Sequence, residues 1–170
     1  YNIGNSFINI DNRDSAMLFL DKAIEIDPKY AIAVYRKGDV FAKYMEDDSA
    51  MFYFTKAMEL DPNEEDAYNS IGNLKYTRKE YEAAIPYYEK ALQIKPKFRE
   101  AWFNLGNCYD GLGDTLKAIE NYLRAIEADS SYALAYSSVA GMYEEAGDND
   151  NALKYYLKAV EFNPADIESL

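Results

Sequence analysis

The chain has 170 residues, 49% of them hydrophobic, and a net charge of −12 at pH 7. A chain of this length and composition can bury a core, but its negative charge repels phosphate backbones, so we expect no nucleic-acid partner. No segment approaches the ~20 consecutive apolar residues that cross a bilayer, and we therefore expect no membrane segment.

Two residue types that usually carry chemistry are scarce. Histidine is absent, which removes the commonest general base and zinc ligand, and Cys108 is the only cysteine, which rules out an internal disulfide and a cysteine-based metal cage. We therefore expect no enzymatic activity, no cofactor and no metal site. A single cysteine fits a reducing compartment and favours the cytoplasm, although the sequence does not identify the compartment. Cys108 itself lies on an apolar stripe and is expected to be buried and inert.

Small residues and prolines recur along the chain at a constant interval of 34 residues, which is the interval from Pro28 to Pro62. The prolines are Pro28, Pro62, Pro96 and Pro164, with Ser130 at the remaining position of this row; the alanines form two rows, Ala16, Ala50, Ala84, Ala118 and Ala152, then Ala23, Ala57, Ala91, Ala125 and Ala159; a third row is Gly4, Gly38, Gly72, Gly106 and Ala140. A fixed period of this length is the sequence pattern of stacked repeats.

In chain order, the rows predict a shortened unit at 1–30, then units at 31–64, 65–98, 99–132 and 133–166, with 167–170 beginning a further helix. Each unit is expected to be a helix, a tight turn and a second helix. In the unit 99–132 the first apolar stripe is Ala101, Leu105, Cys108 and Leu112, and the second is Ala118, Ile119, Tyr122, Ala125 and Ile126. Gly113 and Asp114 separate them, and Asp114 is expected to cap the second helix, as is Asp148 in the next unit.

The unit 99–132 also carries Trp102, Leu105, Gly106, Tyr109, Ala118, Tyr122 and Ala125 at spacings that resemble the signature of the tetratricopeptide repeat (TPR) family. The resemblance covers almost the whole chain. It implies an all-α fold, a right-handed α-solenoid of about five antiparallel helical hairpins, and a role as a protein–protein interaction scaffold. In-phase tyrosines such as Tyr88, Tyr122 and Tyr156 are expected in the core. Met45 and Lys79 depart from the pattern, because they stand at turn positions where other units have glycine.

The resemblance also implies that the first helix of each unit lines a concave groove that holds a peptide. The groove residues are expected to be Asn2, Asn5, Tyr35, Arg36, Asp39, Asn69, Asn73, Tyr76, Phe103, Asn104, Asn107, Asp110 and Glu144. A row of asparagine amides can pair with an extended peptide backbone, and it is similar to the asparagine ladder in the TPR superhelix of O-linked N-acetylglucosamine transferase. The alternative is that these asparagines are ordinary surface residues.

Two further features bear on the partner. Tyr35, Tyr76 and Phe103 could be aromatic anchors for a ligand, or they could pack between neighbouring units. Acidic residues such as Asp110 and Glu144 gather in the last two full units, so a basic or mixed-charge peptide is favoured there.

Two alternatives remain open for the function. The segment could recruit substrates for a larger enzyme such as a glycosyltransferase, whose catalytic domain would lie outside these residues. It could also self-associate through uncapped repeat ends, which expose apolar surface.

Overall fold

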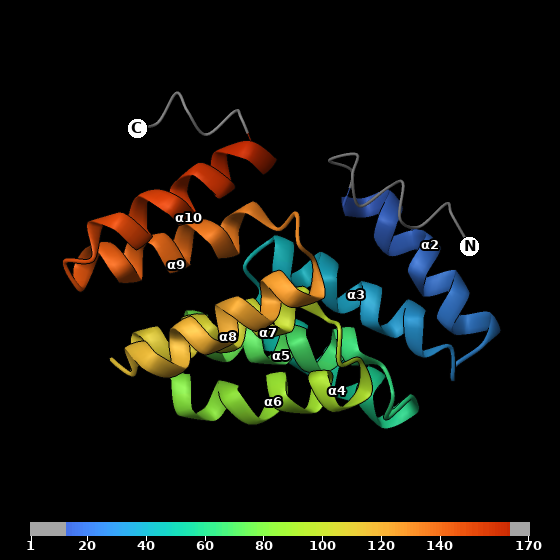
Figure 1. Cartoon of the computed structure of the whole chain (residues 1–170). Coiled ribbons are helices and arrows are strands. Elements are labelled where there is room, and N and C mark those ends of the chain that lie inside the picture. The colour runs from blue at the N-terminus through green and yellow to red at the C-terminus, as the bar shows by residue number, and fades with distance from the viewer. Residues whose placement is uncertain (1–12, 164–170) are drawn as a thin grey trace. The chain divides into compact units, whose positions relative to one another are not determined.

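The computed structural model describes residues 13–163, which form nine α-helices and no strand (Figure 1). This confirms the predicted all-α helical-repeat fold. The expected first helix of the unit 1–30, with Asn2 and Asn5, lies outside the described residues, as do 167–170. Within 13–163 no helix is both long enough and apolar enough to traverse a bilayer.

The chain divides into two compact units, residues 1–74 and 75–170. The first contains α2 (Arg13–Ile26), α3 (Ala31–Lys43), α4 (Asp47–Leu60) and most of α5 (Glu65–Thr77). The second contains the end of α5 and then α6 (Tyr81–Ile94), α7 (Arg99–Gly111), α8 (Thr115–Ala128), α9 (Ala133–Glu145) and α10 (Asn149–Phe162). Consecutive helices pack together, α2 on α3 and α3 on α4 in the first unit, and α6 through α10 in the second.

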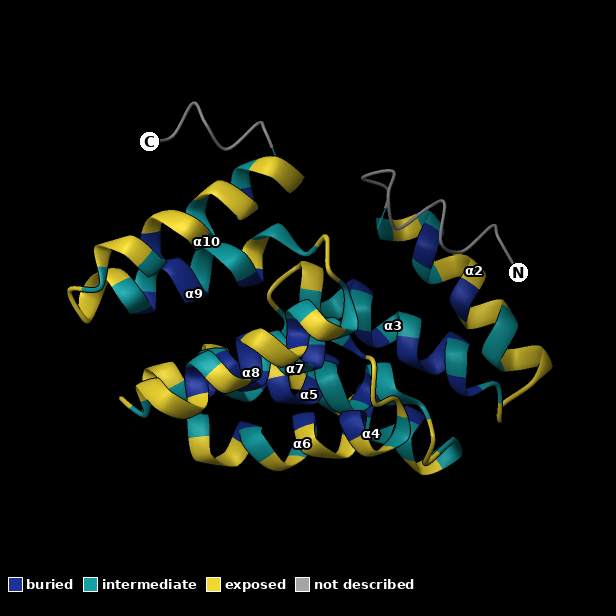
Figure 2. Ribbon diagram, viewed as in Figure 1, coloured by how far each residue is buried: buried dark blue, intermediate teal, exposed yellow. Residues whose placement is uncertain are grey.

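Alanines and aromatic residues are prominent in the buried core, and Figure 2 shows in dark blue where buried residues lie along the helices. Ala118 and Ala125 of α8 have no exposed surface, and such small side chains allow helix backbones to approach closely. Between them Tyr122 lies against Gly106 of α7, so that a Cβ placed on Gly106 would lie 2.6 Å from two of its ring carbons. Phe54 lies against Gly38 in the same way. The rows of small residues are therefore packing positions.

Tyr156 departs from the expected pattern. Tyr88 and Tyr122 are buried as predicted, but Tyr156 is only partly buried, and its hydroxyl donates to Glu144 Oε2 at 2.8 Å. The residue in register with Gly106 is Ala140, and because a Cβ on Gly106 would lie 2.6 Å from ring carbons of Tyr122, the methyl group of Ala140 disfavours the same ring position for Tyr156. The expectation that Tyr156 belongs to the core is therefore wrong.

The turns between paired helices follow two designs. Asp114 accepts from the backbone N–H of Lys117, and Asp148 accepts from that of Asn151, both at 3.2 Å, which confirms the two predicted caps. Gly113, just before Asp114, adopts a φ of 76°. Met45 and Lys79 adopt a φ of 59°, a left-handed conformation that disfavours residues with a Cβ.

Candidate peptide-binding surface

In the first unit, Tyr35 of α3 joins two neighbouring repeats. Its ring lies 5.4 Å from that of Phe54, and its hydroxyl lies 3.2 Å from Ser70 Oγ on α5. The side chain is 7% exposed, and burial raises the pKa of its hydroxyl. Two roles were expected for Tyr35, and this geometry fits packing between neighbouring repeats, because little of the ring is left to contact a ligand.

Arg36 and Asp39, one turn apart on α3, form an ion pair with Nη1 and Oδ2 separated by 2.9 Å. The guanidinium carbon lies 5.2 Å from the centre of the Tyr35 ring, within the range of a cation–π contact. Burial raises the pKa of Asp39 above its usual value, against the opposing effect of Arg36. The predicted residues Tyr35, Arg36 and Asp39 therefore form one connected cluster with Ser70.

In the second unit, a hydrogen bond between α8 and α7 fixes one of the predicted asparagines. The hydroxyl of Tyr122 donates to Asn107 Oδ1 at 2.8 Å, and Ser138 of α9 is close enough to lower the pKa of that hydroxyl slightly against the effect of burial. Burial raises the pKa of the Tyr122 hydroxyl, which therefore keeps its proton at neutral pH. Because the oxygen of the carboxamide is held by this donor, the amide group of Asn107 presents two N–H donors.

The aromatic candidates of the second unit contact other rings. Phe103 lies 5.4 Å from both Tyr122 and Tyr132, and Tyr76 lies 5.4 Å from Tyr81, measured between ring centres. Phe103 and Tyr76 both remain partly exposed. They therefore pack between helices and still leave surface that a ligand can contact.

The remaining predicted residues are accessible to solvent to different extents. Asn69 and Asn104 are half-buried, Asn73 is exposed, and all three interact with other residues of the chain. Asp110 and Glu144 are exposed, and Glu144 accepts the hydroxyl of Tyr156. The carboxylate of Asp110 is close enough to raise the pKa of Tyr122 further, after burial. The structure thus brings Asn107 and Asp110 together beside Tyr122, whereas Tyr76 contacts Tyr81.

A groove that the sequence reasoning missed lies between α6, α7 and α8. It has a volume of about 620 Å³, and the residues that line it include Trp102 and Tyr109 of α7 and Asn121 of α8. Asn121 is the one polar side chain classed as buried in 13–163. The signal that could have revealed the groove is the loss of an aromatic residue at position 121, where the in-phase positions of other units carry one.

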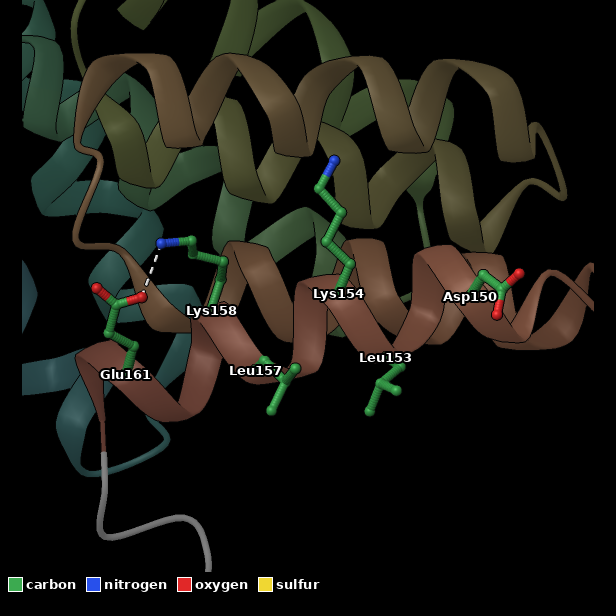
Figure 3. Close-up of a pocket in the computed structure, with 6 residues that line it drawn as sticks. All are labelled: Asp150, Leu153, Lys154, Leu157, Lys158 and Glu161. Carbon is green, nitrogen blue, oxygen red and sulfur yellow. Dashed lines mark hydrogen bonds and ion pairs between the residues drawn. The ribbon is translucent and has the colours of Figure 1, made fainter.

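The outward face of α10 is apolar at two positions. Leu153 and Leu157 are 60% and 62% exposed, and Figure 3 shows them projecting from the same side of the helix, beside the ion pair of Lys158 and Glu161. Leu153 is in register with Ile119 of α8, which packs against the cluster of Val139 and Met142 on the following helix. Within 13–163, no following helix covers Leu153.

Family models for the tetratricopeptide repeat match residues 1–30, 65–98, 100–132 and 133–166. The chain belongs to the tetratricopeptide repeat family. This TPR array shares its fold with solved structures, and its membership supports a protein-interaction scaffold. Within 13–163 no group of three or more metal-ligating side chains is placed to hold an ion.

Three solved structures illustrate the likeness. A crystal structure of MamA is 27% identical, with a TM-score of 0.80 over 98% of this chain and 97% of MamA. YrrB, described as a TPR protein with an unusual peptide-binding site, is 24% identical with a TM-score of 0.70 over 99% of this chain and 90% of its own. PilF of Pseudomonas aeruginosa is 24% identical with a TM-score of 0.89, over 95% of this chain and 74% of its own. The search of curated proteins gave no match.

Proposed function

We propose that this TPR array is a scaffold that binds an extended peptide along the first helices of its repeats. The observation that carries the proposal is the hydrogen bond from Tyr122 to Asn107, 2.8 Å long, because it orients a carboxamide on the expected inner face. A carboxamide held through its oxygen offers its N–H donors to a peptide carbonyl, and backbone recognition of this kind does not depend on the peptide sequence.

The same surface favours a particular charge on the peptide. Asp110 lies near Tyr122 on α7, and Glu144 lies on α9, which is the first helix of the following repeat. Exposed carboxylates attract basic residues mainly by accelerating the encounter, and salt screens that attraction. The proposed ligand is therefore an extended peptide whose backbone contacts the asparagine amides and which carries basic residues in that stretch.

The test is a selection from a random peptide library on the intact chain, followed by calorimetric titration of the selected peptide against variants. Asn104→Ala combined with Asn107→Ala should weaken binding at least tenfold, which corresponds to about 1.4 kcal/mol, while helicity stays unchanged. The matched control is Asn149→Ala, because Asn149 is exposed at the start of α10. Equal binding by the double variant and the control would place the peptide elsewhere on the chain.

A variant of Tyr122 tests the orienting bond separately. Tyr122→Phe keeps the ring that packs on Gly106 but removes the hydroxyl donor to Asn107. The carboxamide is then free to rotate, so peptide binding should weaken about threefold to tenfold, as expected for one neutral hydrogen bond. Unchanged affinity would mean that the orientation of Asn107 has no part in binding.

The second candidate function is self-association, which the exposed Leu153 and Leu157 favour. Leu153 is in register with the packed Ile119, so it suits another helical hairpin from a second copy of the chain. Leu157 is in register with Leu123, which is itself 37% exposed, and it extends the apolar surface. Light scattering across a concentration series tests this. Leu153→Lys with Leu157→Lys should yield a monomer where the wild-type chain associates, and a wild-type chain that stays monomeric at all concentrations would exclude the idea.

A further inference from the structure

One position in the second helix of the repeats is aromatic in every described unit except one. The in-phase residues are Phe19, Tyr53, Tyr87, Asn121 and Tyr155. Asparagine has none of the ring volume of its counterparts. The hairpin of α7 and α8 therefore lacks a ring that the other described hairpins have at this position.

Where the ring is present, it packs between residues of the first helix of the same unit. Tyr155 of α10 stacks on Tyr143 with 5.6 Å between ring centres, and its centre lies 6.3 Å from that of Tyr136. Tyr53 of α4 stacks on Phe41 at 5.3 Å. The ring thus has an aromatic neighbour on the first helix in both hairpins.

In the hairpin of α7 and α8 the aromatic neighbours remain while the ring is missing. Tyr109 is in register with Tyr143, and Trp102 is in register with Tyr136. Both line the groove of about 620 Å³ whose lining also includes Asn121. The groove therefore contains the place that a tyrosine ring occupies in the next repeat, with the two rings that would flank it still present.

Asn121 adds a polar group to this place. The side chain is 7% exposed, and its Nδ2 donates to the backbone oxygen of Lys117 at 2.7 Å. Its Oδ1 accepts no hydrogen bond from the described residues and is not shielded from solvent, so it can accept a hydrogen bond from a donor that enters the groove. A ring that enters from solvent with its para position first brings a phenolic hydroxyl toward Asn121.

The rim of the groove is mostly acidic. Glu89 of α6 and Glu120 of α8 belong to it, and the one cation, Lys117, is paired with Asp114 at 2.9 Å. The ammonium of Lys117 also lies 4.9 Å from the centre of the Tyr109 ring, whose counterpart Tyr143 stacks on the ring of Tyr155 in the equivalent hairpin. Lys117 is more than half exposed, so a ligand can displace it without unfolding the helix.

We propose that this groove binds a tyrosine side chain of a partner protein, flanked in the partner by basic residues. The ring would stack with Trp102 and Tyr109, its hydroxyl would donate to Asn121 Oδ1, and the basic residues would face Glu89 and Glu120. This site lies on residues outside the row of first-helix asparagines, so it is a second surface that does not depend on the proposed peptide-binding function.

The fluorescence of Trp102 reports on this groove directly, because Trp102 is the only tryptophan of the chain. We would excite the indole selectively and titrate the full chain with acetyl-Arg-Tyr-Arg-amide, and in parallel with the peptides that carry leucine or phenylalanine in place of tyrosine. A saturable change is expected with the tyrosine peptide, and the leucine peptide should bind about threefold to tenfold more weakly. Equal affinity for tyrosine and leucine would overturn the proposal.

Substitutions taken from the other repeats sharpen the test. Asn121→Tyr restores the ring found in the other units, so it should close the groove and abolish the tyrosine-dependent change. Lys117→Ser introduces the in-phase residue Ser49 and should strengthen binding by freeing the face of Tyr109. Retained binding in a folded Asn121→Tyr variant would overturn the assignment.

Two surface variants keep the test decisive if Asn121→Tyr fails to fold. Glu89→Gln and Glu120→Gln should each weaken the basic tyrosine peptide about twofold, with the loss disappearing at high salt. No loss in either variant would refute the charge complementarity. The double variant Asn104→Ala, Asn107→Ala should leave the Trp102 signal unchanged, so failure here and failure of the proposed function are distinguishable.

Discussion

The close contact between Gly106 and Tyr122 makes Gly106→Ala the sharpest test of the packing in this array. The added methyl would lie 2.6 Å from Cδ1 and Cε1 of a ring that is 2% exposed, about 1 Å closer than ordinary carbon contacts. Either the helices separate or the ring leaves the core, and both routes cost about 1–3 kcal/mol. For a chain of this size the melting temperature should fall by roughly 3–10 °C in a circular-dichroism melt.

Gly141→Ala is the matched control, because Gly141 is also a helical glycine. A Cβ there would meet only the hydroxyl of Tyr156, at an ordinary 3.9 Å. Alanine has the higher helix propensity, so this variant should gain up to about 1 kcal/mol. Opposite signs for the two substitutions are expected. If Gly106→Ala were as stable as Gly141→Ala, the ring would not be held against Gly106 and the packing argument would be refuted.

Three other predictions concern the turns, a loop carboxylate and the thiol. Lys79→Gly should raise stability by about 0.5–1 kcal/mol in urea unfolding, because glycine relieves the left-handed backbone, whereas Gly113→Ala should lower it. Hydrogen bonds from Ser131 and an ion pair with Arg99 lower the pKa of Asp129 from 3.8 to about 2. The stability that Asp129 contributes is therefore present above pH 4 and is lost as the pH falls toward 2, so urea curves of Asp129→Asn and wild type should differ at neutral pH and converge near pH 2. Burial raises the pKa of Cys108 to about 12, so a thiol reagent should label the native chain at least about a hundredfold more slowly than the urea-unfolded chain.

The helical-repeat fold could be predicted from the sequence because its cause repeats in phase. Ala118 and Ala125 of α8, like Ala50 and Ala57 of α4, are fully buried where the rows place them. The caps were equally readable, since an aspartate after a glycine has one obvious hydrogen-bonding role in a helical hairpin. Helix packing and capping of this kind depend on few residues, and several repeats of the chain show the same residues at the same positions.

The candidate site was harder to predict, because its features depend on pairs of residues from different helices. Tyr35 is nearly covered because it contacts Phe54 and Ser70, and the spacing of residues within α3 does not reveal these contacts. That Tyr156 would leave the core follows from one methyl group on Ala140, a small residue that looks equivalent to glycine in a pattern. Whether the asparagine row binds a peptide remains a prediction.

Because the repeats share one pattern, a residue that departs from it can be compared with its counterparts in the other repeats. Ala140 and Asn121 both depart from the pattern, but other side chains compensate for these two departures differently. At Ala140 the displaced ring of Tyr156 gains a hydrogen bond with Glu144, so that position is satisfied within the chain. At Asn121 the ring is missing, and the ammonium of Lys117, an exposed side chain that also pairs with Asp114, lies over Tyr109. Because the side chain of Lys117 is exposed to solvent, the ring of a partner can displace it from Tyr109. This difference in compensation is the physical reason that Asn121, rather than Ala140, marks a place for a partner.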